Sequence, residues 1–223
     1  MPTRISSPAR PRPLPLVRRA FESLVSLLAP DVCAACDERT PIMTIFCPSC
    51  AATLERATDT SDDDIAPFVY GGALAIAIAS LKYEERLDRA RPLSHLLLGA
   101  IEPLRRDPPS HVVPVPLHRA RAARRGGNQA ALLAAPVARA LGARFAASAL
   151  RRTRETQAQA TLPRASRIPN VEDAFVARRR IEGARVLLVD DVRTTGATLA
   201  ACARALRAAG ARDVRTLVLA CAE

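Results

Sequence analysis

The 223-residue chain has no tryptophan, five phenylalanines, two tyrosines and a single lysine, Lys82. Because aromatic side chains are so few, we expect the core to consist of leucine, valine, isoleucine and alanine. The formal net charge of +11 therefore comes almost entirely from arginine. Arginine binds phosphate through two hydrogen bonds at once and stays charged at physiological pH, which favours polyanionic partners. A genomic preference for arginine would produce the same bias.

Long apolar runs are also missing. The longest uncharged apolar stretch, around residues 73–81, is too short to span a bilayer. Residues 16–28 place apolar side chains on one helical face, but charged residues interrupt the core that a signal peptide requires. We therefore predict a cytoplasmic protein with no membrane span. Residues 1–30 are expected to form a basic tail and this amphipathic helix.

Four of the six cysteines form two C-x-x-C pairs, Cys33 with Cys36 and Cys47 with Cys50. Each pair can present two thiolates from a tight turn, and four thiolates complete the tetrahedral coordination of Zn²⁺. We therefore predict a structural zinc ribbon over residues 31–57, which has too little apolar mass to fold without the metal. Disulfides are the alternative, but nothing directs the chain to an oxidising compartment. A redox centre suits two neighbouring pairs less well than a metal cage does.

An acidic, polar segment without apolar periodicity, residues 58–66, follows the ribbon. We place a domain boundary there and predict one α/β domain over residues 67–223, which is long enough to bury a substantial core. The ribbon would be either a platform for nucleic acid or a protein partner, or a folded cap on this domain. The sequence does not distinguish these two roles.

The most informative segment is VLLVDDVRTTGAT, residues 186–198. Its apolar beginning predicts a strand buried on both faces, as in a parallel sheet. Asp190 and Asp191 then lie at the carboxyl end of that strand, where open α/β sheets bind their ligands. Helical spacing up to Gly210 places the intervening loop at a helix N-terminus, whose N–H groups favour an anion. The residues of this loop are Thr194, Thr195, Gly196, Ala197 and Thr198.

A ribose 5-phosphate matches this arrangement of acids and loop. Carboxylates repel phosphate, so the two aspartates require a neutral donor or a cation, and the ribose diol offers two O–H donors near the phosphate. No GxxxxGK[ST] or GxGxxG sequence competes for phosphate binding. An ordinary buried strand followed by a polar turn is the alternative, but such strands seldom end in paired acids.

A second strand is predicted over residues 111–115, where prolines on both sides of Val115 would stiffen a turn that aims amides at a ligand. A helix is predicted from residue 129 to residue 141, and Pro136 should kink or shorten it. Residues 151–173 are rich in arginine and lack an apolar period, which indicates a functional loop or a solvated surface. Further strands are expected over residues 144–150, 174–176 and 214–220.

Three features in this order resemble the ComF family, phosphoribosyltransferase-fold proteins linked to competence for DNA uptake: the four-cysteine segment, VVPVPLHRARAARRGGNQ and VLLVDDVRTTGAT. The resemblance covers about residues 20–223. It implies an α/β fold of the type I phosphoribosyltransferase kind, with a mostly parallel sheet flanked by helices. It also implies that Asp190 and Asp191 hold the ribose hydroxyls of phosphoribosyl pyrophosphate (PRPP), while residues 194–198 hold its 5-phosphate.

The resemblance further implies a pyrophosphate loop after the second strand, Mg²⁺ bound with PRPP, and a flexible loop that closes over the pyrophosphate. Two residues depart from the family pattern. Gly127 replaces an aromatic residue and Arg193 an apolar or aromatic one, so we expect a more mobile loop and a more positive phosphate pocket. The pyrophosphate loop comprises Pro114, Val115, Pro116, Leu117, His118, Arg119 and Arg121, and the flexible loop includes Arg154, Thr156, Gln159, Arg167 and Asn170.

Three functions follow as hypotheses. The leading one is transfer of phosphoribosyl from PRPP to an unidentified nitrogen acceptor, with release of pyrophosphate. The second is non-catalytic handling of single-stranded DNA, in which the pocket binds a nucleotide or a phosphate end. The third is a scaffold that docks a competence helicase or another recombination partner through the ribbon and the N-terminal helix. No residue stands out as an acceptor site.

Overall fold

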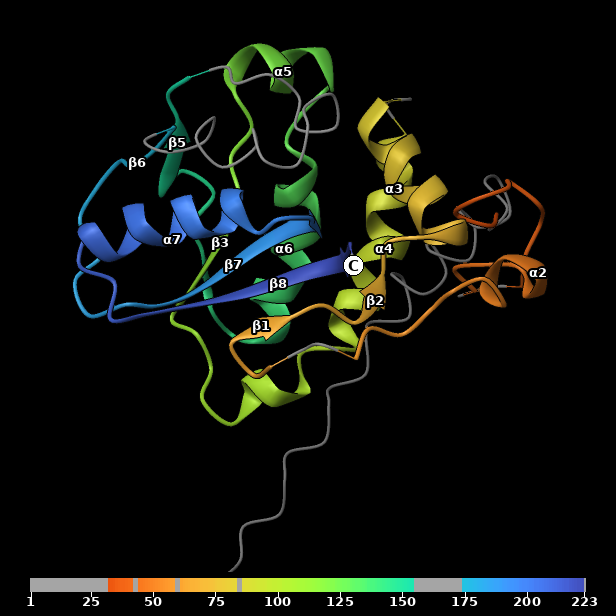
Figure 1. Cartoon of the computed structure of the whole chain (residues 1–223), viewed down its shortest axis with the longest axis horizontal. Helices are drawn as coiled ribbons and strands as arrows, with labels where there is room; N and C mark the ends of the chain where they lie inside the picture. Colours follow the sequence, from red (N-terminus) through yellow and green to blue (C-terminus); the bar gives the residue numbers. More distant parts are fainter. Residues whose placement is uncertain (1–31, 42–43, 59–60, 84–85, 155–173, 223) are drawn as a thin grey trace, which may run out of the picture.

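A six-stranded, entirely parallel sheet forms the centre of the computed structural model (Figure 1). Its strand order is β1-β8-β7-β3-β4, and β2 pairs with the carboxyl end of β8. The strands are β1 (Asp64–Ile65), β2 (Phe68–Val69), β3 (His111–Pro114), β4 (Arg144–Phe145), β7 (Arg185–Arg193) and β8 (Asp213–Cys221). The structure describes residues 32–41, 44–58, 61–83, 86–154 and 174–222.

The helices flank this sheet, and a short antiparallel hairpin lies beside it. Among the described residues, none of the helices combines the length and apolar character needed to cross a membrane. The hairpin consists of β5 (Leu150–Arg152) and β6 (Phe175–Ala177). The α-helices are α2 (Pro48–Ala51), α3 (Gly72–Tyr83), α4 (Ala90–Leu98), α5 (Arg119–Arg124), α6 (Gln129–Ala140) and α7 (Ala197–Ala208), and the 3-10 helices are η1 (Leu87–Arg89) and η2 (Glu102–Arg105).

The central strands β7 and β8 are apolar on both faces, which confirms the prediction of a buried parallel strand. Alternate residues of a strand point to opposite faces. Leu187 and Val189 therefore join the core that includes α3, α4 and α6, whereas Val186 and Leu188 join the core that includes α7 and the hairpin. Aliphatic side chains and alanine fill both cores, as the scarcity of aromatics predicts.

The predicted strand over residues 144–150 is wrong in extent. Arg144–Phe145 forms β4 at the edge of the main sheet, whereas Leu150–Arg152 forms β5 in the hairpin. Between them the N–H group of Ala149 donates to the carbonyl of Ala146 at 3.0 Å, which closes a turn. The intervening residues are alanine and serine, and such small side chains gain little from the cross-strand packing that stabilises a strand.

The helix α6 continues through Pro136, so the expected shortening does not occur. Proline removes the hydrogen bond to the carbonyl four residues earlier, here that of Leu132. Leu132 is an exposed residue, and water can satisfy a carbonyl on that side of the helix.

Part of the predicted linker is a strand of the main sheet. Asp64 and Ile65 form β1, which pairs with β8 in parallel register at Thr216 and Leu217. Ile65 and Ala66 are buried. The two apolar residues inside an otherwise acidic segment are therefore enough to attach it to the sheet edge. The predicted N-terminal tail and helix, residues 1–30, lie outside the described residues.

Candidate functional site

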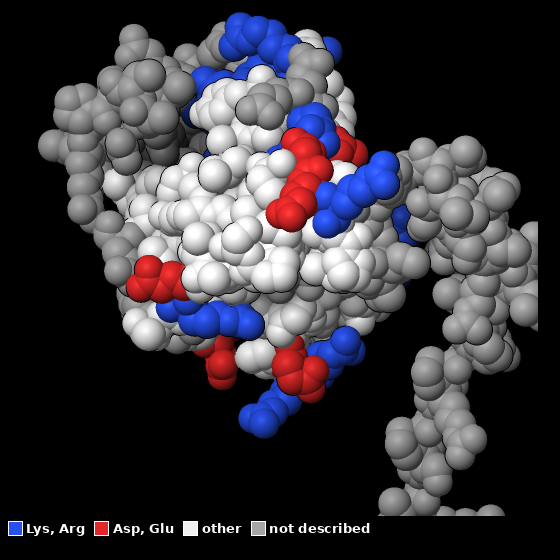
Figure 2. Space-filling view, turned by 90° about the vertical axis from the view of Figure 1, so that its right-hand side faces the viewer, with Lys and Arg blue, Asp and Glu red and all other residues white. Residues whose placement is uncertain are grey.

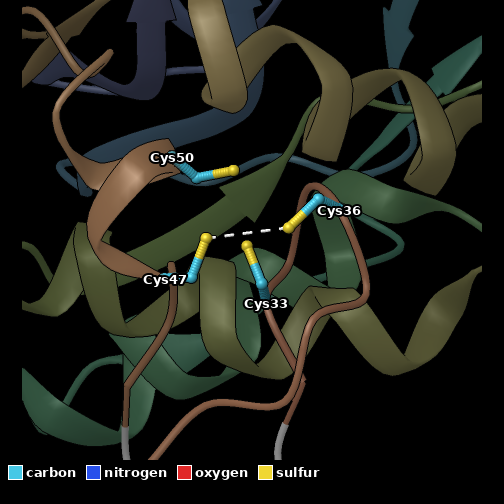
Figure 3. Close-up of side chains that lie close together, drawn as sticks. All are labelled: Cys33, Cys36, Cys47 and Cys50. Atoms are coloured by element: carbon cyan, nitrogen blue, oxygen red, sulfur yellow. Dashed lines mark hydrogen bonds between the residues drawn. The ribbon is translucent and has the colours of Figure 1, made fainter.

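The four cysteines of the predicted ribbon point toward one another (Figure 3). Their sulfur atoms all lie within 4.8 Å of one another. Zn–S bonds of about 2.3 Å in a tetrahedron would separate the sulfurs by about 3.8 Å, and Cys36 Sγ lies 3.7 Å from Cys47 Sγ. All six cysteines of the chain are free thiols. Cys33, Cys36, Cys47 and Cys50 could therefore hold a zinc ion, and no disulfide joins them in the structure.

The electrostatics of the cluster suit a cation. Burial alone would raise the pKa of the Cys33 thiol, but backbone N–H groups of Cys36, Cys47 and Ala35 point at its sulfur and lower that pKa to about 6. Burial, together with the neighbouring thiols, raises the pKa of Cys50. Four thiols this close cannot all ionise without a positive charge between them, and a divalent metal supplies that charge.

The ribbon is packed onto the main domain. Phe46 and Cys47 belong to the same buried cluster as Leu74 and Leu81 of α3. At the turn of the first cysteine pair, Asp37 forms ion pairs with Arg86 at 3.0 Å and Arg89 at 2.8 Å. Arg89 is 4% exposed and also donates to the carbonyl of Ala34. These contacts favour the role of a folded cap on the domain.

The two aspartates lie next to the predicted pyrophosphate loop. Asp190 and Asp191 are at the carboxyl end of β7, and β3 is the neighbouring strand, with Pro114 opposite Val189. The pairing extends one residue further, because the N–H group of Val115 donates to the carbonyl of Val189 at 2.9 Å. The chain then leaves the sheet through Pro116, Leu117 and His118, and His118 is the N-cap of α5. Two segments about 70 residues apart in the sequence thus meet at one edge of the sheet.

The predicted phosphate loop opens α7, as its sequence suggested. Gly196 is the N-cap of α7 and has a φ of 73°, in the left-handed region that only glycine adopts at low cost. Thr195 Oγ1 accepts from the N–H group of Ala197 at 3.4 Å. A hollow of about 320 Å³ lies beside the loop, and Thr194, Thr195 and Gly196 form part of its wall. The helix N-terminus is therefore next to a space that an anion could enter.

Arg193 does not make the phosphate pocket more positive, contrary to our expectation. Its guanidinium Nη1 lies 2.7 Å from Asp64 Oδ2, and Asp64 also accepts a hydrogen bond from Thr216 Oγ1. The partner comes from the segment predicted to be a linker, which the sheet places beside the end of β7. The charge of Arg193 is thus largely compensated by an ion pair that ties β7 to the sheet edge.

Asp191 has a partner that the sequence did not predict. Its side chain is 11% exposed, and its Oδ1 lies 2.8 Å from Nζ of Lys82 at the end of α3. Burial alone would lower the pKa of Lys82, but the charges of Asp191 and Asp190 outweigh that effect and raise it. Gln129, buried at the start of α6, donates to the carbonyl of Leu81 at 3.4 Å and so fixes the end of α3. The only signal in the sequence was that Lys82 is the sole lysine.

Asp190 has a different environment from its neighbour. It is half-buried on the α7 side of the sheet, and its Oδ1 accepts from the N–H group of Asp191 at 2.9 Å. Burial raises the pKa of Asp190 to about 7, the charge of Asp191 adds to the rise, and Lys82 opposes it. Asp190 is thus a carboxyl group with a raised pKa at the end of a strand, a feature common at functional sites. Burial also raises the pKa of the Cys202 thiol, which belongs to the core on the α7 side of the sheet.

Arginine is concentrated around α5. Figure 2 shows blue side chains gathered at the upper end of that view, at the level where Figure 1 places α5, whereas further down red and blue side chains lie next to one another. Arg119 is exposed and Arg121 half-buried, and the guanidinium of Arg125 lies 5.0 Å from the ring centre of Tyr83. Gly127 has a φ of 152° with no atom within 4 Å of an added Cβ, so its conformation, not lack of space, disfavours an aromatic residue there.

The flexible loop lies mostly outside the described residues. Arg154 is its last described residue, and Thr156, Gln159, Arg167 and Asn170 fall within the segment 155–173, which the structure does not describe. The two ends of that segment are held together by the hairpin, where Arg152 pairs with Phe175. The strand predicted at residues 174–176 is present one residue later, as β6 (Phe175–Ala177).

The chain is similar in sequence to several known proteins. The phosphoribosyl transferase domain model matches residues 128–222. The DNA utilization protein YhgH of Escherichia coli K12 is 31% identical over 209 residues, which cover 84% of this chain and 89% of the relative. Competence protein F of Haemophilus influenzae is 34% identical over 154 residues, which cover 66% of this chain and 67% of the relative. A purine phosphoribosyltransferase structure from Pyrococcus horikoshii shares 19% identity with a TM-score of 0.37, covering 59% of this chain and 74% of that one. By its identity to relatives over most of their length, the chain belongs to the ComF family of phosphoribosyltransferase-domain proteins.

Proposed function

We propose that the protein binds PRPP at the carboxyl edge of the sheet. Asp190 and Asp191 would accept hydrogen bonds from the ribose hydroxyls, residues 194–198 would bind the 5-phosphate at the N-terminus of α7, and residues 114–118 with the arginines of α5 would bind the pyrophosphate. The observation that supports this proposal is the pairing of β3 with β7, because it brings residues 114 and 115 next to the end of the strand that carries the two acids. Open α/β sheets bind ligands at such an edge.

The reaction supported best by these groups is transfer of the phosphoribosyl group to a nitrogen nucleophile. The bond between C1 of the ribose and the pyrophosphate oxygen breaks, a C1–N bond forms, and the nitrogen loses a proton. Positive charge develops on the ribose ring, and carboxylates near the ring stabilise it. Lys82 would act as a positioning residue, because it neutralises the buried carboxylate of Asp191 and fixes one of its oxygens.

Two metal ions belong to this proposal. A zinc ion held by Cys33, Cys36, Cys47 and Cys50 would have a structural role, because four protein ligands leave no open position. Reduced thiols at this site suit the cytoplasm. Mg²⁺ would be bound chiefly by the oxygens of PRPP itself and would offset the negative charge of the leaving group. Arg119 and Arg121 would add positive charge on the same side.

Replacing Asp190 with asparagine is expected to separate ligand binding from folding. We expect the affinity for PRPP with Mg²⁺ to fall at least tenfold, because a hydrogen bond to a charged group contributes about 1.5–3 kcal/mol. Pyrophosphate release with a suitable acceptor should be abolished. Calorimetric titration of both proteins with PRPP and Mg²⁺ measures the first effect. Asp213→Asn, a change at the opposite end of the sheet, is the matched control and should bind normally. Wild-type protein that produces no heat with PRPP would refute the proposal.

The same substitution is expected to stabilise the protein above neutral pH. The pKa of Asp190 is about 7 in the folded protein, compared with an ordinary value of 3.8. Between these values the folded protein keeps a proton that the unfolded chain loses, so this residue makes unfolding easier as the pH rises from about 4 to 7. The full difference corresponds to about 4 kcal/mol, and partial solvent access reduces it, so we expect Asp190→Asn to raise the melting temperature at pH 8 by roughly 3–6 °C. No gain at pH 8 relative to pH 5 would contradict the assignment.

A second function, binding of single-stranded DNA, is favoured by two observations. The relatives are named as DNA utilization and competence proteins, and this chain carries a net charge of +11. With few aromatic side chains to stack on bases, binding would depend on phosphate contacts and would weaken steeply with salt. We expect the affinity for an oligothymidylate to fall at least tenfold between 50 and about 200 mM salt, as measured by fluorescence polarisation. An affinity that hardly changes over this range would exclude the phosphate-dominated mode.

A further inference from the structure

A second hollow, of about 350 Å³, lies at the amino-terminal ends of the strands. Its walls include the first residues of β3 and β4, the loop before β7 and the start of the turn before β5. In Figure 1 the amino-terminal ends of β7 and β8 point away from α3, so this hollow is at the opposite edge of the sheet from the proposed PRPP site. Four of its lining residues are small: Ala146, Ala149, Gly183 and Ala184. Their size leaves the space open.

The walls of the hollow are positively charged. Arg144, Arg179 and Arg180 all line it, and Glu182 is its single acidic lining residue. Arg180 and Glu182 form an exposed ion pair at 2.6 Å. Within the described part of the chain, neither Arg144 nor Arg179 forms an ion pair. Two exposed guanidinium groups on one hollow are therefore available to an anion.

His111 lines the same hollow and lies within reach of this positive charge. Its Nδ1 lies 3.0 Å from Oγ of Ser110, whose hydroxyl donates to the carbonyl of Arg185 at 3.0 Å. Nδ1 of His111 is therefore the donor to Ser110, and its Nε2 is free to take up a proton. Burial lowers the pKa of His111, and the charges of Arg144 and Arg179 lower it further. An anion in the hollow would offset those charges and favour the protonated ring.

We propose that this hollow, the amino-edge pocket, is a second anion site that binds a phosphate group. Arg144 and Arg179 would bind the phosphate oxygens through paired hydrogen bonds, and His111 would add a donor once protonated. The volume is at the lower end of the range for small-molecule pockets, which suits one nucleotide unit. The phosphate would belong either to a nucleic-acid backbone or to a free nucleotide. The pocket does not depend on the PRPP site. If the phosphate belongs to a nucleic-acid backbone, the pocket is where the protein carries out the second proposed function, binding of single-stranded DNA.

Histidine NMR tests the proposal directly, because the chain has three histidines. His111 lines the amino-edge pocket, His118 lies in the pyrophosphate loop, and His95 is exposed on α4. We would titrate each ring with pH in the presence of thymidine monophosphate, inorganic phosphate or a ten-residue oligothymidylate. Binding is expected to raise the pKa of His111 by about 1, while the signals of His95 do not respond. A ligand that moves only His118 would support the PRPP site and overturn the second site.

Variants identify the groups that bind. The double substitution Arg144→Ala and Arg179→Ala should abolish the response of His111 to phosphate. It should also make oligonucleotide binding less sensitive to salt. The slope of the logarithm of the binding constant against the logarithm of the salt concentration should become shallower by about 0.7 for each lost phosphate contact. Arg139→Ala, an exposed residue on α6, is the matched control and should behave as wild type. PRPP binding should be unchanged in the double variant and in the control variant. This result would show that both variants are folded and that the two sites act separately.

The probes distinguish the source of the phosphate. For each probe we would compare the phosphate concentration at which the response of His111 saturates. Saturation at a lower concentration with thymidine monophosphate than with the oligothymidylate would assign the site to free nucleotides. Saturation at a lower concentration with the oligothymidylate would assign it to a nucleic-acid backbone. A response of His111 that survives in the double variant would overturn the proposal, as would the absence of a response to all three probes.

Discussion

Replacing Cys47 with serine is expected to abolish binding of one zinc ion per chain and to lower the melting temperature by on the order of 10 °C. A metal present at about 1,000 times its dissociation constant contributes about 4 kcal/mol to folding, and each kcal/mol shifts the melting temperature by about 2–4 °C at this chain length. The cluster is not isolated from the rest of the protein, because Phe46 and Cys47 share a core with α3. Loss of the metal should therefore destabilise the main domain as well.

Metal analysis and thermal unfolding, each with and without a chelator, measure this effect. Cys202→Ala is the matched control, because it removes a buried thiol from the other core and should leave one zinc ion bound. Unchanged melting of the Cys47→Ser protein, or a zinc content that stays at one per chain, would show that the four thiols are not a metal site.

Replacing Lys82 with methionine is expected to weaken both folding and PRPP binding. The substitution leaves the carboxylate of Asp191 buried and without its cation at 2.8 Å. Breaking a buried ion pair by removing one partner costs about 3–5 kcal/mol. Because Lys82 is 21% exposed, we expect a smaller loss, roughly 2–3 kcal/mol. Affinity for PRPP should fall at least tenfold, since Asp191 loses the contact that orients it.

Two further variants separate the role of the ion pair from simple loss of packing. Lys82→Met combined with Asp191→Asn removes both charges and should recover at least half of the lost stability, without recovering PRPP binding. Lys82→Arg keeps the charge in a larger, planar group, so it should fold well and bind PRPP with intermediate affinity. Equal PRPP affinity of Lys82→Met and wild type would refute the positioning role, even if the wild-type protein binds PRPP as proposed.

The segments that the sequence predicted well are those in which one local pattern dictates the structure. The apolar residues 186–189 are long enough and branched enough to require a buried strand, and β7 confirms this. The helical spacing that follows required α7, with glycine at its start. The cysteine spacing likewise sufficed, because two C-x-x-C turns bring four sulfurs together almost independently of the rest of the chain.

Segments with weak local preferences were predicted less well. Residues 146–149 are small and have no strong strand preference, so the competition between the main sheet and the hairpin decided where each strand ends. Asp64 and Ile65 lie in an acidic segment, and only the available edge of β8 makes them a strand. In both cases hydrogen bonding to a distant partner outweighs the local sequence.

The sequence by itself determined the class of fold, the cysteine cluster and the strand, acids and loop that form the proposed PRPP site, because each depends on residues close together in the chain. Tertiary structure decided which charges meet. It paired Lys82 with Asp191 and Arg193 with Asp64, and it gathered Arg144 and Arg179 around His111 at the opposite edge of the sheet. Electrostatic energies depend on distance and burial, and these are fixed only when strands and helices far apart in the sequence pack against one another.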